Sequence, residues 1–135
     1  MNSFRFLLTV IWLVSSTAAT TTFYLNGTLF CPLGTYSYHL VIFEEDIMYD
    51  DVLSNQPRQV AHGNTEYEIT GSDDGDGWFN NYYEIVLHII HSCHSDGEYA
   101  KKLIKVDYGS FPIEKNGEHY ISKDIQLYNQ GTRKQ

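Results

Sequence analysis

The chain has 135 residues, and its 17 acidic and 9 basic side chains give a formal net charge of −8. Such an acidic chain repels nucleic acid and offers no broad basic surface to anionic lipid, so we expect no nucleic-acid partner. The length fits a single small domain.

The N-terminus has the three-part pattern of a secretory signal peptide. Arg5 supplies a positive charge, Phe6–Val14 is a mostly apolar run, and the small residues of Ser15–Ala19 suit signal peptidase. The apolar run is less than half of the roughly 20 residues that a membrane-spanning helix needs, and no later segment is long and apolar enough to span a bilayer. We therefore expect residues 1–18 to be removed and residues 19–135 to form a secreted, extracellular domain.

Export would allow two modifications that the sequence suggests, a disulfide bond and N-glycosylation. An oxidising compartment permits one intramolecular disulfide between Cys31 and Cys93, the two cysteines of the chain. Two free thiols or an intermolecular bridge are the alternatives, and we expect the internal bridge. Asn26-Gly27-Thr28 is the one N-glycosylation sequon, so Asn26 is a candidate glycan site whose occupancy the motif leaves open.

The first half of the mature region is predicted to form β-strands, because tyrosine and β-branched residues are common in it. The segment Phe23–Cys31 places alternate apolar residues on one face and opens the domain. Tyr38–Glu44 is the next strand. The polar segment Asp46–Pro57 is predicted to be a loop, with a weak helical tendency over residues 50–55.

The second half continues the same pattern. Glu66–Thr70 alternates cleanly and is followed by an Asp- and Gly-rich turn, Ser72–Gly77. Tyr83–Cys93 is the strongest segment and is predicted to be a central strand, since every second residue from Tyr83 onward shares one face. Three shorter segments supply the remaining strands: Leu103–Tyr108, His119–Ile121 and Asp124–Tyr128. Short strands separated by turn signals predict an all-β fold, an antiparallel β-sandwich of about seven to eight strands.

Four short motifs occur in order along these predicted strands. Gly27–Cys31 has the form G-x-L-x-C, and Leu40–Asp46 is an acidic strand that precedes a D-D-x-L turn at Asp50–Leu53. Tyr67–Gly71 has an aromatic residue, a hydrophobic residue and a glycine at alternate positions, and Ile89–Cys93 has the form I-x-H-x-C. Together these motifs resemble the nematode transthyretin-like family over the whole mature chain.

The resemblance implies a transthyretin-type β-sandwich, secretion and a mostly unassigned function. It also implies that His91 is a structural residue, hydrogen-bonded near the disulfide. The chain departs from the family where Thr65 and Gln126 replace expected glycines, and where it lacks the further cysteines that many relatives carry after the His-x-Cys strand. These departures concern loop details.

Histidine and cysteine residues that gather near the end of the central strand raise the question of a metal site. His91 and Cys93 point to one face of the predicted strand, whereas His88 and His94 point to the other. Only two of the four side chains share a face, so we expect no metal and no cofactor.

The turn Ser72–Gly77 also resembles part of a calcium-binding loop, with Asp74 and Asp76 at two ligand positions. The last ligand position holds Tyr83 in place of the usual glutamate, and no flanking helices are expected. A solvated acidic hairpin is therefore the favoured interpretation, and calcium binding is left open. A second acidic group carries the same ambiguity: Asp46, Asp50 and Asp51.

No nucleophile with a neighbouring base forms a local catalytic signature, so no catalytic residues and no enzyme activity are predicted. The related sandwich hydrolases that act on 5-hydroxyisourate use a His, Arg and His set and end in Tyr-Arg-Gly-Ser. This chain ends in Gly131–Gln135, and its only arginines beyond the signal segment are Arg58 and Arg133. A hydrolase is therefore a distant third hypothesis.

Two functional hypotheses precede it. The first is an extracellular binding or signalling protein that recognises a cell-surface or extracellular protein or lipid through the aromatic loop of Trp78, Phe79 and Tyr82, since aromatic side chains are favoured in binding hot spots. An alternative role for Trp78 and Phe79 is to cover the end of the sandwich. The second hypothesis is a carrier of a small apolar ligand or lipid, bound in a dimer cleft or in the mouth of the sandwich.

Overall fold

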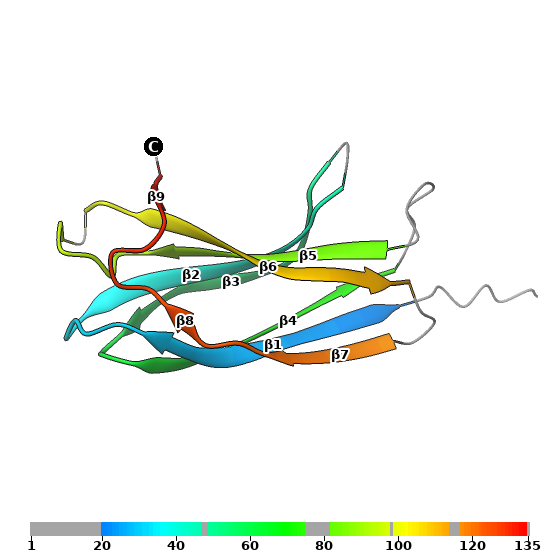
Figure 1. The fold of residues 1–135 in the computed structure, drawn as a ribbon, viewed down its shortest axis with the longest axis horizontal. Helices are drawn as coiled ribbons and strands as arrows, with labels where there is room; N and C mark the ends of the chain where they lie inside the picture. The colour runs from blue at the N-terminus through cyan, green and yellow to red at the C-terminus, as the bar shows by residue number, and fades with distance from the viewer. Residues whose placement is uncertain (1–19, 47–48, 75–81, 98, 114–116, 135) are drawn as a thin grey trace, which may run out of the picture.

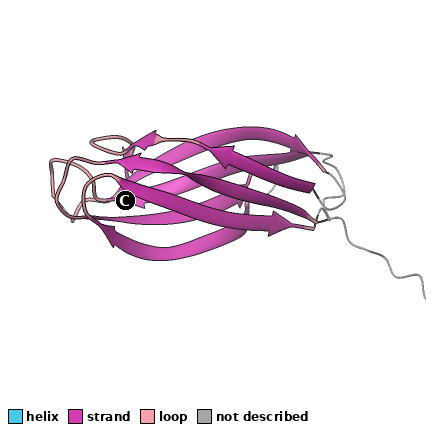
Figure 2. Ribbon diagram, turned by 90° about the horizontal axis from the view of Figure 1, so that it is seen from below, coloured by secondary structure: helices cyan, strands magenta, loops and turns pink. Residues whose placement is uncertain are grey.

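The computed structural model describes residues 20–46, 49–74, 82–97, 99–113 and 117–134, and it shows two β-sheets packed face to face (Figure 1). The described residues contain strands and loops only (Figure 2), and they include no helix long and apolar enough to cross a membrane. The predicted all-β sandwich is confirmed. The described residues form nine strands, two of which contain only two residues each.

The four-stranded sheet has the order β4-β1-β7, with β8 also paired to β1. Strand β1 runs antiparallel to β4 and parallel to β7 and β8. The strands are β1 (Thr21–Phe30), β4 (Thr65–Asp73), β7 (Gly117–Ser122) and β8 (Ile125–Gln126).

The five-stranded sheet is antiparallel and has the order β3-β2-β5-β6-β9. Strand β5 lies between β2 and β6, so the predicted central strand is confirmed, and its inward side chains from Tyr83 to His91 are buried. The strands are β2 (Tyr36–Glu44), β3 (Asp51–Ala61), β5 (Tyr82–His91), β6 (Lys102–Pro112) and β9 (Thr132–Arg133).

Strand β3 corrects the sequence-based prediction, which assigned Asp46–Pro57 to a loop with a weak helical tendency. Strand β3 lies at the edge of its sheet, and most of its side chains are exposed or half-buried. An edge strand tolerates Pro57, and a register shift in its pairing with β2, at Leu53, interrupts the alternation of side chains. These two features remove the pattern by which strands are recognised in a sequence.

The core lies between the sheets and is crossed by the disulfide. Cys31 follows β1 in one sheet and Cys93 follows β5 in the other, and their Cα atoms are 6.2 Å apart. The predicted internal bridge is therefore confirmed, and it joins the two sheets. Since it closes a loop of 62 residues, loop-closure entropy alone would contribute about 4 kcal/mol to stability.

The two sheets pack closely at Gly71, in β4. A Cβ atom on this residue would lie 3.1 Å from Leu53 Cβ and 3.2 Å from Ile42 Cδ1. These neighbours come from β3 and β2 of the opposite sheet, so the absent side chain lets the two sheets approach at this point.

We predict that Gly71→Ala lowers the free energy of unfolding by about 1–3 kcal/mol, because Leu53 and Ile42 must move to admit the methyl group. Urea denaturation measures this change. Gly34→Ala is the control: no atom lies within 4 Å of the added Cβ, and it should not destabilise the fold. Equal stability of Gly71→Ala and wild type would contradict the prediction.

Candidate functional site

At one end of the sandwich, strands β1, β3, β5 and β7 begin and strands β2, β4 and β6 end (right in Figure 1). Three carboxylates lie at strand termini there: Glu44 is the last residue of β2, Asp51 the first of β3 and Asp73 the last of β4. Their carboxylate oxygen atoms lie within 4.8 Å of one another. We call these three residues the acidic cluster, and the end of the sandwich that holds them the acidic end.

The register of the strands explains why these side chains meet. Alternate residues of β2 point inward, and Glu44 continues the buried row of Leu40 and Ile42. Asp51 lies directly opposite Glu44 across the β2–β3 pair, so both side chains share one face. Asp73 enters from the other sheet, opposite Thr21 of β1. The acidic cluster thus lies at the edge of the core, with Glu44 buried, Asp73 half-buried and Asp51 exposed.

Burial and like charge both act on Glu44, of which only 7% is exposed. The pKa of its carboxyl is raised to about 7, first by burial and then by Asp73, Asp46 and Asp51, whereas a backbone hydrogen bond at Glu84 lowers it. At neutral pH this carboxyl therefore holds a proton for a large part of the time, because the site resists a further negative charge.

Tyr83 lies beside the acidic cluster. Its side chain is only 3% exposed, and its hydroxyl is buried without a hydrogen bond of ordinary geometry, although Thr21 lies close enough to lower its pKa. Burial raises the pKa of Tyr83 overall, and the carboxylates that raise it further are Asp73, Glu44 and Asp74. A buried phenol is therefore placed next to the carboxylates, and its hydroxyl makes no hydrogen bond of ordinary geometry to the described residues.

The structure brings together the two acidic segments that the sequence presented separately. Asp51 comes from the second group and Asp73 from the edge of the Asp- and Gly-rich turn. The other described acidic residues of these segments are exposed around them: Asp46, Asp50 and Asp74. Sequence reasoning missed Glu44. The signal was its position, two residues after Ile42 on the row that points into the core.

The predicted aromatic loop is only partly within the described residues. Trp78 and Phe79 lie outside them, as does the predicted signal peptide. Tyr82 is the first residue of β5, at the acidic end, and its side chain is 54% exposed.

The histidines near the disulfide are held by backbone groups at the opposite end of the sandwich. The Cys93 N–H donates to His91 Nδ1 at 3.0 Å, so His91 Nε2 carries the proton and donates to the Gln130 carbonyl at 3.0 Å. His94 is buried and its Nε2 bonds the carbonyl of Ala100. Cys93 is bonded to Cys31, and both ring nitrogens of His91 make hydrogen bonds. Cys93 and His91 therefore have structural roles.

Burial is the main reason that the pKa of His91 is lowered, to about 4. The hydrogen bond to Gln130 acts in the opposite direction, and nearby His94, Lys102 and Lys101 lower the pKa further. The folded protein therefore keeps this imidazole neutral well below its ordinary titration range.

Asn26 lies in the middle of β1, and its side chain is half-buried. Its Oδ1 accepts a hydrogen bond from Ser122 Oγ at 2.5 Å. The amide nitrogen, which a glycan would modify, is not the atom in this bond, and glycosylation of Asn26 stays a prediction.

These features define a small, disulfide-bonded β-sandwich protein with a carboxylate cluster at one end. Residues 27–135 match a family described as Caenorhabditis elegans protein of unknown function (DUF870), and the chain belongs to this family. The predicted nematode family is thereby confirmed at this coarser level. No curated protein and no solved structure matches the chain.

The low pKa of His91 predicts an acid-sensitive fold. Unfolding returns this pKa from about 4 to near 6.5, so between these values the unfolded chain binds a proton that the folded chain does not. The contribution of His91 is complete above pH 6.5, and lowering the pH from 7.5 to 5 should reduce the free energy of unfolding by about 2 kcal/mol.

Glu44 has the opposite effect on the free energy of unfolding between pH 4.5 and 7. Its pKa is raised in the folded state, so the folded protein binds the proton first as the pH falls, and this stabilises the fold. The measurement is therefore a comparison of urea denaturation at both pH values for wild type and His91→Gln, which share Glu44. Wild type should lose about 2 kcal/mol more than the variant. Equal losses would show that His91 does not titrate as inferred.

Proposed function

We propose that this chain is a secreted, non-enzymatic binding protein of the transthyretin-like type, which recognises an extracellular or cell-surface partner through its acidic end. The Cys31–Cys93 bridge supports export, because disulfides persist in oxidising compartments. The placement of His91 next to this bridge agrees with the role that the resemblance implies for it.

The observation that carries the proposal is the group of exposed apolar side chains at the acidic end. Tyr49 is 76% exposed, and Val52 and Tyr82 are each 54% exposed. Val52 pairs with Phe43, which pairs with Val86, and this row lies on the outer face of the five-stranded sheet. Large exposed apolar and aromatic groups beside charged residues are typical of recognition surfaces.

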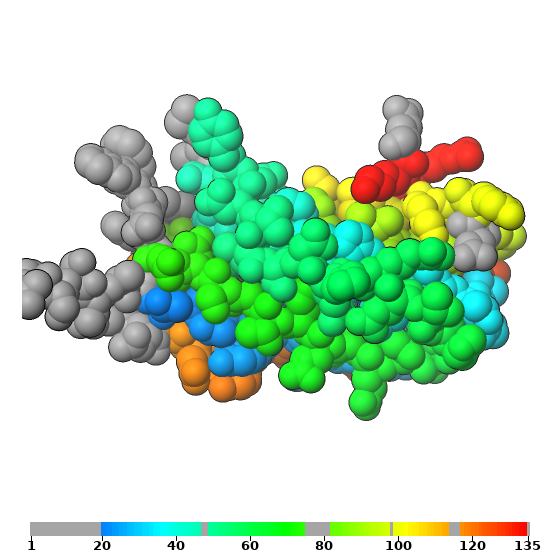
Figure 3. All heavy atoms as spheres, turned by 180° about the vertical axis from the view of Figure 1, so that it is seen from behind, coloured from blue at the N-terminus to red at the C-terminus, as the bar shows by residue number. Residues whose placement is uncertain are grey.

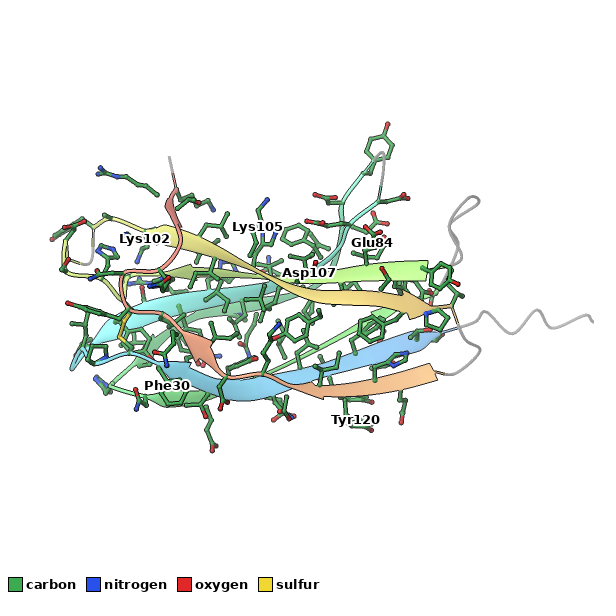
Figure 4. The ribbon with its side chains drawn as sticks, viewed as in Figure 1. Phe30, Glu84, Lys102, Lys105, Asp107 and Tyr120 are labelled. Carbon is green, nitrogen blue, oxygen red and sulfur yellow. A yellow bond between two sulfur atoms is a disulfide. The ribbon has the colours of Figure 1, made fainter. Side chains whose placement is uncertain are left out.

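Part of this surface lies next to a projecting part of the molecule. The start of β3, which carries Val52, stands out from the body of the sandwich (Figures 1 and 3). Glu84 lies on the same outer face, whereas Tyr120 lies on the opposite face of the sandwich (Figure 4). Tyr120 stacks on Tyr24 with ring centroids 4.4 Å apart, so its exposed ring is already engaged within its own sheet.

Two hollows of the described surface are lined mostly by polar residues, which gives no support to a carrier of an apolar ligand. Ligand pockets for such molecules are mostly apolar, yet two surface hollows of about 520 and 560 Å³ share a lining of Glu66, Tyr67 and Glu68. Asn26 and Thr28 complete the first, and Gln56 and Gln59 contribute to the second. A carrier function therefore remains the second hypothesis, and the hydrolase the third.

We predict that Tyr82→Ala weakens saturable binding of the labelled protein to nematode cell surfaces or extracellular matrix by at least tenfold, as expected for loss of an aromatic hot spot. Equilibrium binding isotherms measure the effect. Tyr99→Ala is the matched control, because Tyr99 is fully exposed in the β5–β6 loop at the opposite end. Unchanged binding of Tyr82→Ala, with its thermal unfolding also unchanged, would exclude this surface.

Secretion has its own test. Expressed from its full coding sequence in nematode cells, the protein should be recovered from the medium with a new N-terminus near Ala19, which N-terminal sequencing detects. A form retained in cells with Met1 at its start would contradict export.

A further inference from the structure

We propose that the acidic cluster is a binding site for a divalent cation, with Glu44, Asp51 and Asp73 as its protein ligands and Ca²⁺ as its occupant. This inference does not depend on the partner proposed above, since it rests on the carboxylates and Tyr83 alone.

The geometry of the acidic cluster fits one cation. Calcium takes oxygen ligands at 2.3–2.6 Å, so two oxygens on opposite sides of the ion lie about 4.6–5.2 Å apart. One oxygen from each of Glu44, Asp51 and Asp73 already lies within 4.8 Å of the other two. The three ligands could therefore contact a common ion without movement of the strands that hold them.

The hydroxyl of Tyr83 is the second, independent observation. This side chain is almost fully buried, and its hydroxyl makes no hydrogen bond of ordinary geometry to the described residues, although Thr21 lies close to it. The carboxylates that act on it are Asp73, Glu44 and Asp74, so it lies next to the proposed ion position. Buried hydroxyls are normally satisfied by protein or ordered water, and a water bound to the cation would be a partner of the right kind.

The chemistry of the donors selects the class of cation. All three protein ligands are carboxylates, which suit hard cations such as Ca²⁺, Mg²⁺ and Mn²⁺. They come from strands of two different sheets and form an irregular set, which suits the flexible coordination of Ca²⁺ better than the strict octahedron of Mg²⁺. The exposed carboxylates of Asp46, Asp50 and Asp74 add negative charge around the acidic cluster.

A bound cation should stabilise the folded state through its attraction to the three carboxylates. Without a cation, three neighbouring carboxylates repel one another at a position where Glu44 is buried. A divalent cation removes this repulsion in the folded state, while the unfolded chain does not hold the three ligands together. Binding should therefore stabilise the fold by mass action.

The test is thermal unfolding of the purified, disulfide-bonded mature chain in EDTA and in 5 mM CaCl₂. Extracellular calcium modules have dissociation constants near 10⁻⁴–10⁻³ M, so we expect Ca²⁺ to raise the unfolding temperature by roughly 3–10 °C. An unchanged unfolding temperature would overturn the proposal. A shift in 5 mM MgCl₂ equal to or larger than that in CaCl₂ would overturn the choice of Ca²⁺.

Variants locate the site. Glu44→Gln and Asp73→Asn should abolish the shift, and in EDTA Glu44→Gln should unfold at or above the wild-type temperature, because it removes a buried carboxylate that lies beside two others. This second readout separates loss of the site from loss of the fold. Glu66→Gln is the control, since Glu66 is an exposed carboxylate in the same strand as Asp73, and it should keep the full shift.

Two results would overturn this assignment of ligands. One is an undiminished shift in Asp73→Asn. The other is a shift that Asp74→Asn abolishes and Glu44→Gln retains, which would move the site to the Asp- and Gly-rich turn.

Discussion

The disulfide between Cys31 and Cys93 is the constraint on which one end of the sandwich depends. It joins the ends of β1 and β5, and therefore the two sheets. The last turn of the chain is attached to it: the Asn129 N–H donates to the Cys93 carbonyl, and the Gln130 carbonyl accepts from His91. A neutral histidine is needed here, because protonation would place a second N–H against the N–H of Cys93.

The opposite end of the sandwich has a different physical character. The rows of apolar side chains that fill the core do not end in further apolar groups but in Glu44, Asp51 and Asp73. Strand pairing places Glu44 directly opposite Asp51, so the two side chains leave the sheet from neighbouring positions on one face. One end is therefore closed by a covalent bond, whereas the other keeps a concentration of negative charge that a smaller core residue or an amide would avoid. Such an arrangement is unfavourable for stability alone, and it therefore points to a ligand.

The sequence predicted the strands whose side chains alternate strictly, and it failed where the pattern weakens. Strand β5 was recognisable because its inward row is apolar from Tyr83 to Ile89. Strand β3 was missed because its place at the sheet edge leaves most of its side chains exposed. The acidic cluster could not be predicted from the sequence for another reason. Asp51 and Asp73 are 22 positions apart in different sheets, and no local sequence pattern indicates that they are close in space.

The motifs that carry the transthyretin-like resemblance make packing contacts and the disulfide of the fold. Gly71 admits Leu53 of the D-D-x-L segment, and Gly27 lies against the Lys123 carbonyl that also accepts the Tyr67 hydroxyl. The I-x-H-x-C and G-x-L-x-C motifs supply the two halves of the bridge. The resemblance could therefore predict the sandwich without predicting its ligand.

One residue belongs both to a motif of the resemblance and to the acidic cluster. Asp51 is part of the D-D-x-L segment and also part of the acidic cluster. Its side chain is exposed, so it does not contribute to the packing of the core. Glu44 and Asp73 lie outside the structural contacts made by Gly71 and Gly27. The motifs of the fold and the carboxylates of the acidic end are therefore largely separate sets of residues, and chains with the same fold can differ in what they bind.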